Sequence, residues 1–423
     1  MISRRQGKSK QMQPIKKMEL LAPAGDLEKL KIAVDYGADA VYFGGEMFSL
    51  RAGAGNLSTD EIKEGVEYAH RRGVKCHMAF NIFAHNEDIG PMTEYLRRIS
   101  DIPIDAFIVS DPGVMAIVRD ARPDAELHLS TQANMTNYAT ANFWYSQGVK
   151  RLVLARELTF DEIKEIRENI PEDMELEAFA HGAMCISYSG RCLLSNFMID
   201  RDANRGQCAH PCRWKYRLVE EQRPGEYYPI EEDDRGTYIM NSKDLCMLEY
   251  IPELAQAGIS SLKIEGRMKS IFYVASVVGA YRKAIDAYYD DPEGYSCDPA
   301  WMSEMEKASH REFTTGFYFH KPTDKDQNYQ TSDYTRDYSF VGLVRSYDPD
   351  TKMAVVEQRN KMVLGDEIEV FGPGADFFTQ KLEIMENEDG EPIESAPHPQ
   401  QILKIRMEQP VAASFMLRKK KYI

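Results

Sequence analysis

The feature that most constrains this fold is a repeated alternation of short apolar runs and amphipathic segments between Met18 and about residue 290. Short apolar runs predict buried strands, and apolar residues spaced three and four apart predict helices. Capping residues support the helix starts, for example Asp26 and the boxes at 58–61 and 159–162. The predicted strands are residues 19–22, 40–43, 76–80, 106–109, 127–131, 152–155, 176–180 and 262–264.

Eight strands separated by helices predict an α/β fold, a closed parallel (β/α)8 TIM-like barrel over residues 18–290. The alternative is an open doubly wound sheet. The strand count favours closure, and no Gly-x-Gly-x-x-Gly turn follows the first strand. About 80 residues separate the last two predicted strands, and they hold a cysteine-rich insertion at about residues 182–240.

The ends of the chain differ from the barrel. Residues 1–17 form a basic tail with six Lys or Arg and no acid. Residues 291–335 lack clear periodicity, which predicts a linker or wrapping segment. From residue 336 to 423 the pattern changes to alternating strands separated by turns such as 372–374. This predicts a small C-terminal all-β barrel.

Charge and hydropathy limit the partners. No apolar run is long enough to cross a bilayer, and no apolar core follows the basic tail as in a secretory signal. We therefore expect a cytoplasmic protein with no membrane partner. The net charge of −15 argues against non-specific coating of nucleic acid, although a local basic patch is compatible with it.

Polar residues alternate with apolar ones on three of the predicted strands, and this pattern predicts a polar lumen. In a parallel barrel, alternate residues face the lumen and the others face the helices. If Leu262 and Ile264 pack on helices, Lys263 and Glu265 point inward. On the fifth and seventh strands the same rule aims inward the side chains of His128, Ser130, Gln132, Glu177, Phe179 and His181.

Charged groups in a lumen are costly unless they are paired or used. A Lys263–Glu265 ion pair that only fills space is the structural explanation. The functional one is favoured because polar residues follow several strands at their C-terminal ends, where barrel enzymes place their sites. The predicted catalytic residues are Lys263, Glu265, Arg267, His181, Gln132 and Arg156, with His128 and Asn81 as substrate contacts.

Four of the seven cysteines lie within 28 residues, as Cys185-x6-Cys192-x15-Cys208-x3-Cys212. An odd total in a cytosolic chain speaks against a disulfide framework. Structural zinc sites usually use close Cys-x-x-Cys pairs, which are absent here. Four thiolates on irregular loops suit an iron–sulfur cluster. Cys246 is a fifth candidate ligand, whereas Cys76 and Cys297 are interpreted as structural.

Basic residues gather around these cysteines. A solvated surface is one explanation, and an anionic substrate, either a phosphate backbone or a small carboxylate, is the other. Arg205, Arg213 and Lys215 are the predicted substrate contacts in this patch. The tail at 418–421 and the basic N-terminus could add phosphate contacts.

The chain carries no His-Glu-x-x-His, Gly-x-Ser-x-Gly, phosphate-binding loop or radical SAM cysteine motif. Residues 177–195, Glu-Ala-Phe-Ala-His-Gly-Ala-Met-Cys-Ile-Ser-Tyr-Ser-Gly-Arg-Cys-Leu-Leu-Ser, resemble the signature of the collagenase-like U-32 peptidase family. The resemblance covers roughly residues 18–290, and the C-terminal domain resembles the extra domain of the family. Further matching stretches are residues 21–25, 42–45, 48–52, 129–132, 241–245 and 262–267.

This resemblance implies more than proteolysis. The better understood branches of the family carry a four-cysteine [4Fe-4S] cluster and take part in oxygen-independent hydroxylation. The branch that this chain resembles most implies formation of 5-hydroxyuridine at the wobble uridine of tRNA, with prephenate as co-substrate and iron–sulfur assembly machinery as partner. The implied ligands are Cys185, Cys192, Cys208 and Cys212, and Cys246 stays an alternative because a related branch uses a cysteine near that position.

C5 of uridine is not activated for direct hydroxylation, so an electron donor or an oxygen donor is also expected as a partner. Two other functions stay open. A peptidase would use Cys185 with His181 as a nucleophile–base pair. A non-catalytic protein would bind tRNA or the cluster without turnover.

Overall fold

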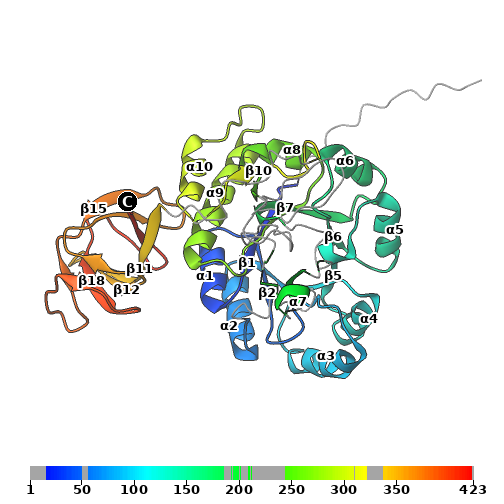
Figure 1. Ribbon diagram of the computed structural model, residues 1–423, viewed down its shortest axis with the longest axis horizontal. Helices are drawn as coiled ribbons and strands as arrows, with labels where there is room; N and C mark the ends of the chain where they lie inside the picture. Colours follow the sequence, from blue (N-terminus) through cyan, green and yellow to red (C-terminus); the bar gives the residue numbers. More distant parts are fainter. Residues whose placement is uncertain are drawn as a thin grey trace, which may run out of the picture.

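A computed structural model describes residues 16–49, 56–184, 192, 194–199, 201, 208–209, 211, 243–308, 310–321 and 337–421. It shows a barrel of strands ringed by helices, with a separate β-sheet at one side of the barrel (Figure 1). No helix in these ranges combines the length and the apolar character needed to cross a membrane.

Eight parallel strands form a closed ring. Each of the strands β1 to β6 pairs with the next strand along the chain, and β9 closes the ring by pairing with both β7 and β1. This closure confirms the predicted (β/α)8 TIM-like barrel and rules out the open sheet. The strands are β1 (Glu19–Ala24), β2 (Ala40–Gly44), β3 (Lys75–Ala79), β4 (Ala106–Val109), β5 (Glu126–Leu129), β6 (Arg151–Val153), β7 (Glu175–Ala183) and β9 (Ser261–Ile264).

Helices begin where the sequence supplies caps. The Asp26 carboxylate accepts a hydrogen bond from Lys29 N at 2.8 Å, and both predicted capping boxes are present, at Ser58 and Thr159. The helices are α1 (Leu27–Asp35), α2 (Thr59–His70), α3 (Asn86–Arg98), α4 (Pro112–Ala121), α5 (Tyr138–Ser146), α6 (Phe160–Glu168), α7 (Leu194–Ile199), α8 (Ile251–Gln256), α9 (Ile271–Asp290) and α10 (Pro299–Glu306).

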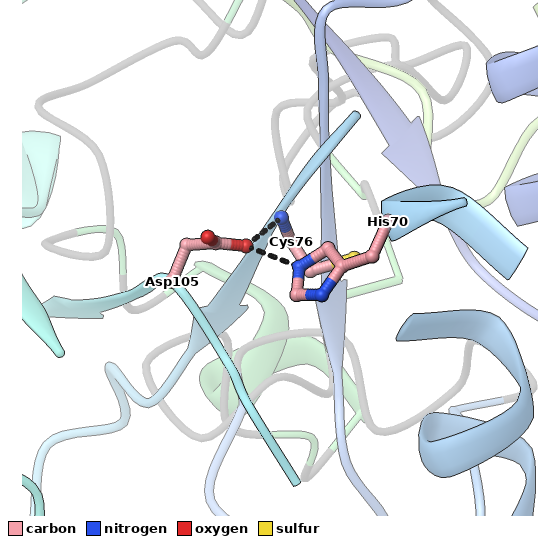
Figure 2. A group of neighbouring side chains, drawn as sticks. All are labelled: His70, Cys76 and Asp105. Carbon is pink, nitrogen blue, oxygen red and sulfur yellow. Dashed lines mark hydrogen bonds and ion pairs between the residues drawn. The ribbon is translucent and has the colours of Figure 1, made fainter. Parts of the chain in front are cut away.

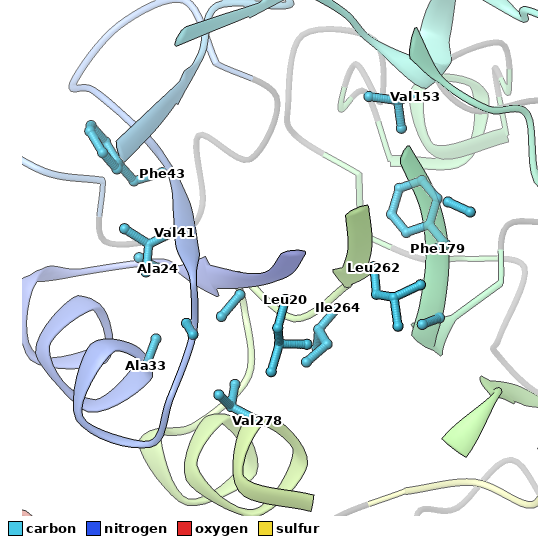
Figure 3. Packing of buried hydrophobic residues seen from close by; sticks show 14 of the residues in the cluster. Leu20, Ala24, Ala33, Val41, Phe43, Val153, Phe179, Leu262, Ile264 and Val278 are labelled. Atoms are coloured by element: carbon cyan, nitrogen blue, oxygen red, sulfur yellow. The ribbon is translucent and has the colours of Figure 1, made fainter. Parts of the chain in front are cut away.

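The main core lies between the barrel strands and their helices. Leu20 of β1 and Ile264 of β9 point toward Val278 of α9 (Figure 3), and all three are fully buried. Leu262 belongs to the same cluster. Burying each such side chain contributes roughly 1.5–3 kcal/mol. Leu262 and Ile264 therefore pack outward as predicted, and Lys263 between them faces the lumen.

The chain between the seventh and eighth barrel strands contains a short strand that the sequence did not predict. β8 (Asp244–Cys246) pairs antiparallel with β7, and β10 (Phe313–Thr314) pairs parallel with β8. Three and two residues are too few to show an alternating pattern. Within the predicted linker or wrapping segment at 291–335, the described residues hold α10 and β10.

The C-terminal part is an antiparallel all-β half-barrel, which confirms the predicted fold class. Its main sheet has the order β15-β14-β19-β11-β12-β18-β16, and its edge strands β15 and β16 do not pair with each other. β13 and β17 form a separate pair. The strands are β11 (Tyr338–Asp348), β12 (Met353–Gln358), β13 (Met362–Val363), β14 (Glu367–Phe371), β15 (Phe378–Lys381), β16 (Met385–Glu386), β17 (Ser395–Ala396), β18 (Ile402–Arg406) and β19 (Met416–Lys420).

A buried arginine joins this sheet to the barrel. Arg418 of β19 has no exposed side-chain surface, and its Nη2 lies 2.7 Å from Glu304 of α10 and 2.8 Å from Glu369 of β14. Phe272 of α9 stacks on Phe340 of β11 with 5.8 Å between ring centroids. Arg418 is therefore not available for phosphate, contrary to the prediction for the basic tail.

Candidate functional site

The N-terminal half of the lumen holds a network of ion pairs. Lys263 Nζ of β9 lies 2.7 Å from Oε1 of Glu177 on β7, whose side chain is fully buried. Arg151 of β6 reaches the other Glu177 oxygen at 3.4 Å. Arg151 also pairs with Glu19 of β1 and Glu175 of β7, at 2.5 and 2.6 Å. Each buried charge of this network therefore has an opposite charge beside it, as burial requires.

These pairs keep Glu177 and Glu175 ionised. Burial alone would raise the pKa of Glu177, but Lys263 and Arg151 outweigh burial and lower that pKa below its usual value. Burial opposes ionisation of Glu175 as well, yet Arg151 and Lys16 lower its pKa to about 2. The predicted partner of Lys263 was Glu265, and the structure corrects it to Glu177. Lys263 thus lies inside the network, below the barrel mouth.

His128 also faces the N-terminal half of the lumen. Its side chain is fully buried, its ring meets the His77 ring edge-on at 4.8 Å, and its Nε2 lies 3.3 Å from Glu126 Oε2 at the start of β5. Burial lowers the pKa of His128, so the ring is neutral at pH 7. The structure therefore does not place His128 among the groups at the mouth, where it was expected to contact substrate.

At the C-terminal rim, Glu265 faces Arg156. Arg156 Nη2 lies 3.8 Å from Glu265 Oε2, and Nη1 donates a hydrogen bond to the Ala183 carbonyl at 3.1 Å. The Arg156 guanidinium also lies 3.8 Å from the centroid of the Phe179 ring. The same ring is 5.7 Å from Lys263 Nζ, so Phe179 contacts one cation of the rim and one cation of the lumen.

Arg267 is fixed at another point of the rim. Its side chain is almost fully buried, and Nη2 donates to Asn56 Oδ1 at 2.6 Å and to Ser49 Oγ at 3.3 Å. A Cβ at position 44 would collide with this guanidinium, which explains the glycine at the end of β2. Lys263 thus pairs with Glu177 of β7, Glu265 with Arg156 after β6, and Arg267 with residues after β2. That all three side chains aim the same way stays a prediction.

Two predicted residues meet where β3 and β5 end. Asn81 Nδ2 donates to Ser130 Oγ at 3.1 Å, and Ser130 Oγ donates to Gln132 Oε1 at 3.3 Å. Gln132 is 2% exposed, and its Nε2 has no hydrogen-bond partner within the described part of the chain. Gln132 therefore offers a buried amide donor at the C-terminal end of the barrel.

His181 leaves the lumen because β7 is irregular near its end. Phe179 pairs with Lys263, but His181 pairs with Ile264, so one extra residue on β7 reverses the alternation. The His181 ring instead packs among Tyr273 and Tyr281 of α9 and Phe313 of β10, at centroid distances of 5.5–5.9 Å. Burial lowers its pKa to about 3. The ring of His181 is thus directed away from the lumen, although its backbone carbonyl accepts a hydrogen bond from Glu265 N at 2.9 Å.

Cys192 and Cys208 are held in neighbouring segments, although 15 residues separate them in the sequence. Ala209 N, next to Cys208, donates to the buried Ser195 Oγ of α7 at 3.1 Å. Leu194 N donates to Cys192 Sγ at 3.4 Å. Two soft sulfur donors are thus brought toward one region, as an iron–sulfur site requires.

The other predicted residues of this region are Cys185, Cys212, Arg205, Arg213 and Lys215, and they lie outside the described residues.

Cys246, the alternative ligand, is buried on β8. Its thiol interacts with the Tyr281 side chain of α9, and burial raises its pKa to about 12. The Tyr281 hydroxyl also donates to the Ala180 carbonyl at 2.7 Å. Cys246 is therefore a protonated core thiol in this structure.

Residues 25–328 match Peptidase family U32, and residues 336–418 match the Peptidase family U32 C-terminal domain. The chain belongs to peptidase family U32. The resemblance seen in residues 177–195 is thereby confirmed, and both parts of the fold are those of this family.

Relatives of this U32 protein carry different kinds of names. The chain is 46% identical over 406 residues to tRNA hydroxylation protein P1 of Bacillus subtilis (strain 168), covering 96% of each chain. It is 39% identical over 422 residues to tRNA hydroxylation protein P of Escherichia coli (strain K12), covering 90% of this chain and 92% of that one. A Collagenase of Porphyromonas gingivalis (strain ATCC BAA-308 / W83) is 34% identical over 376 residues, covering 86% and 89%.

Proposed function

We propose that this U32 protein hydroxylates tRNA, converting the wobble uridine to 5-hydroxyuridine without molecular oxygen and with prephenate as co-substrate. The observation that carries the proposal is the 46% identity to a tRNA hydroxylation protein over 96% of both chains. A match of this extent includes the barrel, the cysteine segment and the C-terminal half-barrel together. The polar barrel rim supports the same reaction class.

The rim offers fixed groups for a planar base and an anionic co-substrate. Arg156 and Arg267 bring two guanidinium groups to the ends of β6 and β9, and guanidinium forks bind carboxylates with both oxygens. Gln132 Nε2 supplies a donor suited to a uracil carbonyl. Glu265, held near Arg156, is the carboxylate placed to move a proton. Lys263 and His128 support this rim from below through the lumen network.

We assign a [4Fe-4S] cluster to Cys185, Cys192, Cys208 and Cys212. The donor set fits, because Cys192 and Cys208 lie in segments joined through Ser195, and sulfur is the donor that iron–sulfur clusters take. The burial of Cys246 against Tyr281 supports leaving it out of the ligand set. When bound, such a cluster supplies one-electron transfer. The iron–sulfur assembly machinery and an electron donor complete the proposed partners.

The tRNA itself is proposed to contact the basic patch. Arg201, beside α7, is exposed, and Arg205, Arg213 and Lys215 follow it in the sequence. Phosphate contacts by lysine and arginine position a nucleic acid without reading its bases. These phosphate contacts would then place the wobble base of the tRNA at the barrel rim.

The peptidase alternative has less support. It requires a nucleophile and a general base, and His181 was the candidate base. His181 is 2% exposed, surrounded by three aromatic rings, and neutral down to a pH of about 3. Such a group does not reach a peptide substrate. The name of the Porphyromonas gingivalis relative nevertheless makes collagen degradation a control that the experiment includes.

The experiment is nucleoside mass spectrometry of tRNA from a deletion strain grown without oxygen. The strain is complemented with the wild-type gene, with the Arg267→Ala variant, or with Arg406→Ala, which removes an exposed arginine far from the rim. Loss of 5-hydroxyuridine in the deletion strain and its return with wild type and Arg406→Ala supports the proposal. Unchanged 5-hydroxyuridine in the deletion strain, together with collagen cleavage by the purified protein, would favour the peptidase.

A further inference from the structure

A second group of metal-ligating side chains lies at the opposite, N-terminal end of the barrel. His70 is the last residue of α2, Cys76 is the second residue of β3, and Asp105 directly precedes β4. One ligand atom of each residue lies within 4.8 Å of the other two. Figure 2 shows the histidine ring next to the cysteine sulfur, with the carboxylate on the far side of the ring.

Hydrogen bonds already hold the three residues in place. Asp105 Oδ2 accepts a hydrogen bond from the backbone N of Cys76 at 2.7 Å and lies 2.8 Å from His70 Nε2. The cysteine and the carboxylate are therefore positioned by the edge of the barrel itself. Sites built on strands and helices are positioned more accurately than sites on loops.

A cavity reaches two of the three residues, whereas the Cys76 side chain is fully buried and does not line it. It has a volume of about 310 Å³, and its walls include His70 and Asp105. The other lining residues are Lys75, Pro103, Ile104, Asp124 and Glu126. Asp124 pairs with Arg122 and Glu126 lies near His128, yet three carboxylates against one lining lysine still favour a cation.

We propose that His70, Cys76 and Asp105 bind one divalent cation of the zinc class, with a fourth coordination position open to the cavity. A nitrogen, a sulfur and an oxygen donor are the ligands that Zn²⁺ takes in proteins. Mg²⁺ and Ca²⁺ prefer oxygen donors only, so this set selects against them. Binding would release the proton of the Cys76 thiol, and the resulting thiolate and the carboxylate together balance the two positive charges of the ion.

The site is separate from the proposed hydroxylation centre. It lies at the N-terminal face of the barrel, whereas Arg156, Glu265 and Arg267 lie at the C-terminal rim. The N-terminal face of such barrels serves stability rather than catalysis. The ion would tie α2 to β3 and to the start of β4. The competing explanation is a histidine–aspartate pair that holds these elements together with no ion.

The experiment is an anaerobic Co²⁺ titration of the full chain, because Co²⁺ replaces Zn²⁺ and its thiolate complexes absorb light. His70→Gln and Cys76→Ser are compared with wild type and with His398→Gln, which removes an exposed histidine of the C-terminal half-barrel. Thiols of the cysteine segment are common to all four proteins, so any Co²⁺ that they bind cancels in the comparison.

We expect wild type and His398→Gln to take up one equivalent more than the two site variants. Removing an outer-shell partner weakens metal affinity 10–100-fold, so loss of a direct ligand should weaken it by about 100-fold or more. His70 is at the surface, so His70→Gln tests the site even if Cys76→Ser does not fold. Equal stoichiometry and equal affinity in His70→Gln and wild type would overturn the proposal and leave the histidine–aspartate pair as the explanation.

Discussion

Lys263 Nζ lies 2.7 Å from the Glu177 carboxylate inside the barrel, and neither side chain is more than 7% exposed. This pair links β9 to β7 across the seam that closes the ring. Phe179, on the same face of β7, contacts both Lys263 and the rim residue Arg156. The lumen network therefore supports the floor of the candidate site.

Breaking this pair should destabilise the barrel. Lys263→Ala leaves the Glu177 charge buried beside Arg151 alone, and removal of one partner of a buried pair costs about 3–5 kcal/mol. The free energy of unfolding, measured by chemical denaturation, should fall by that amount. Lys381→Ala, at an exposed position of β15, is the matched control and should change little. The double change Lys263→Met with Glu177→Leu should recover part of the loss. If Lys263→Ala alone is as stable as wild type, the network does not hold the barrel.

Acid should weaken the fold through Glu175. Arg151 and Lys16 outweigh burial and lower the pKa of this carboxyl to about 2, against an ordinary value of 4.5. A carboxyl with a lowered folded pKa stabilises the protein above its unfolded pKa, and that contribution disappears as the pH falls from about 4.5 to about 2. The Glu175→Gln variant should be less stable at pH 7 and should lose less stability across this window. Parallel stability curves for the two proteins would contradict this assignment.

The alternation rule predicted part of the site correctly and failed at identifiable points. It placed Lys263 and Glu177 in the lumen, because Leu262 and Ile264 are regular strand residues that pack outward. It failed at His181, because the register shifts by one residue after Phe179 and the later side chains of β7 therefore face the opposite side of the sheet. A sequence signal was available at Gly182, which has φ +109° and packs directly against the Glu265 backbone. A glycine within a strand often marks such a bulge.

Partners across the barrel could not be predicted from one strand. Lys263 and Glu265 are two residues apart, which is the spacing that puts both on one face of a strand. Which carboxylate reaches Lys263 depends instead on the stagger between β7 and β9. The register pairs Lys263 with Phe179, which leaves Glu177 one layer lower and within reach. Glu265 follows the end of β9 and meets Arg156 instead.

The docking of the C-terminal half-barrel should depend on Arg418. Arg418→Ala removes the fully buried one of two cations that Glu304 and Glu369 share, and Lys307 still pairs with both carboxylates. The expected loss is therefore at the lower end for a buried pair, about 3 kcal/mol. The neighbouring Lys419, paired with Asp366 and partly exposed, is the control, and Lys419→Ala should cost about 1 kcal/mol or less. Thermal unfolding of the two variants measures the difference. Equal unfolding temperatures would mean that Arg418 does not hold the C-terminal half-barrel against the barrel.

The cysteine assignment predicts iron content. Alanine at Cys185, Cys192 or Cys208 should abolish visible absorbance and bound iron in anaerobically purified protein, since each removes one thiolate ligand. Cys212→Ala and Cys246→Ala are compared singly and together, because one thiol could replace the other. Cys246→Ala alone should keep its iron, given the burial of that thiol. Full iron in any of the first three variants removes that cysteine from the ligand set.

The central claim, that the barrel rim hydroxylates tRNA, is tested most directly at Arg267. Its guanidinium is fixed by Asn56 and Ser49, and it is a cation that we propose for the carboxylate co-substrate. The measurement is the amount of 5-hydroxyuridine in tRNA from deletion cells complemented with Arg267→Ala, with circular dichroism and iron content of the purified variant as controls. The account predicts an intact fold, full iron and no detectable 5-hydroxyuridine, and a similar loss for Glu265→Gln. Wild-type levels of 5-hydroxyuridine with both variants would contradict it and would make these rim residues structural.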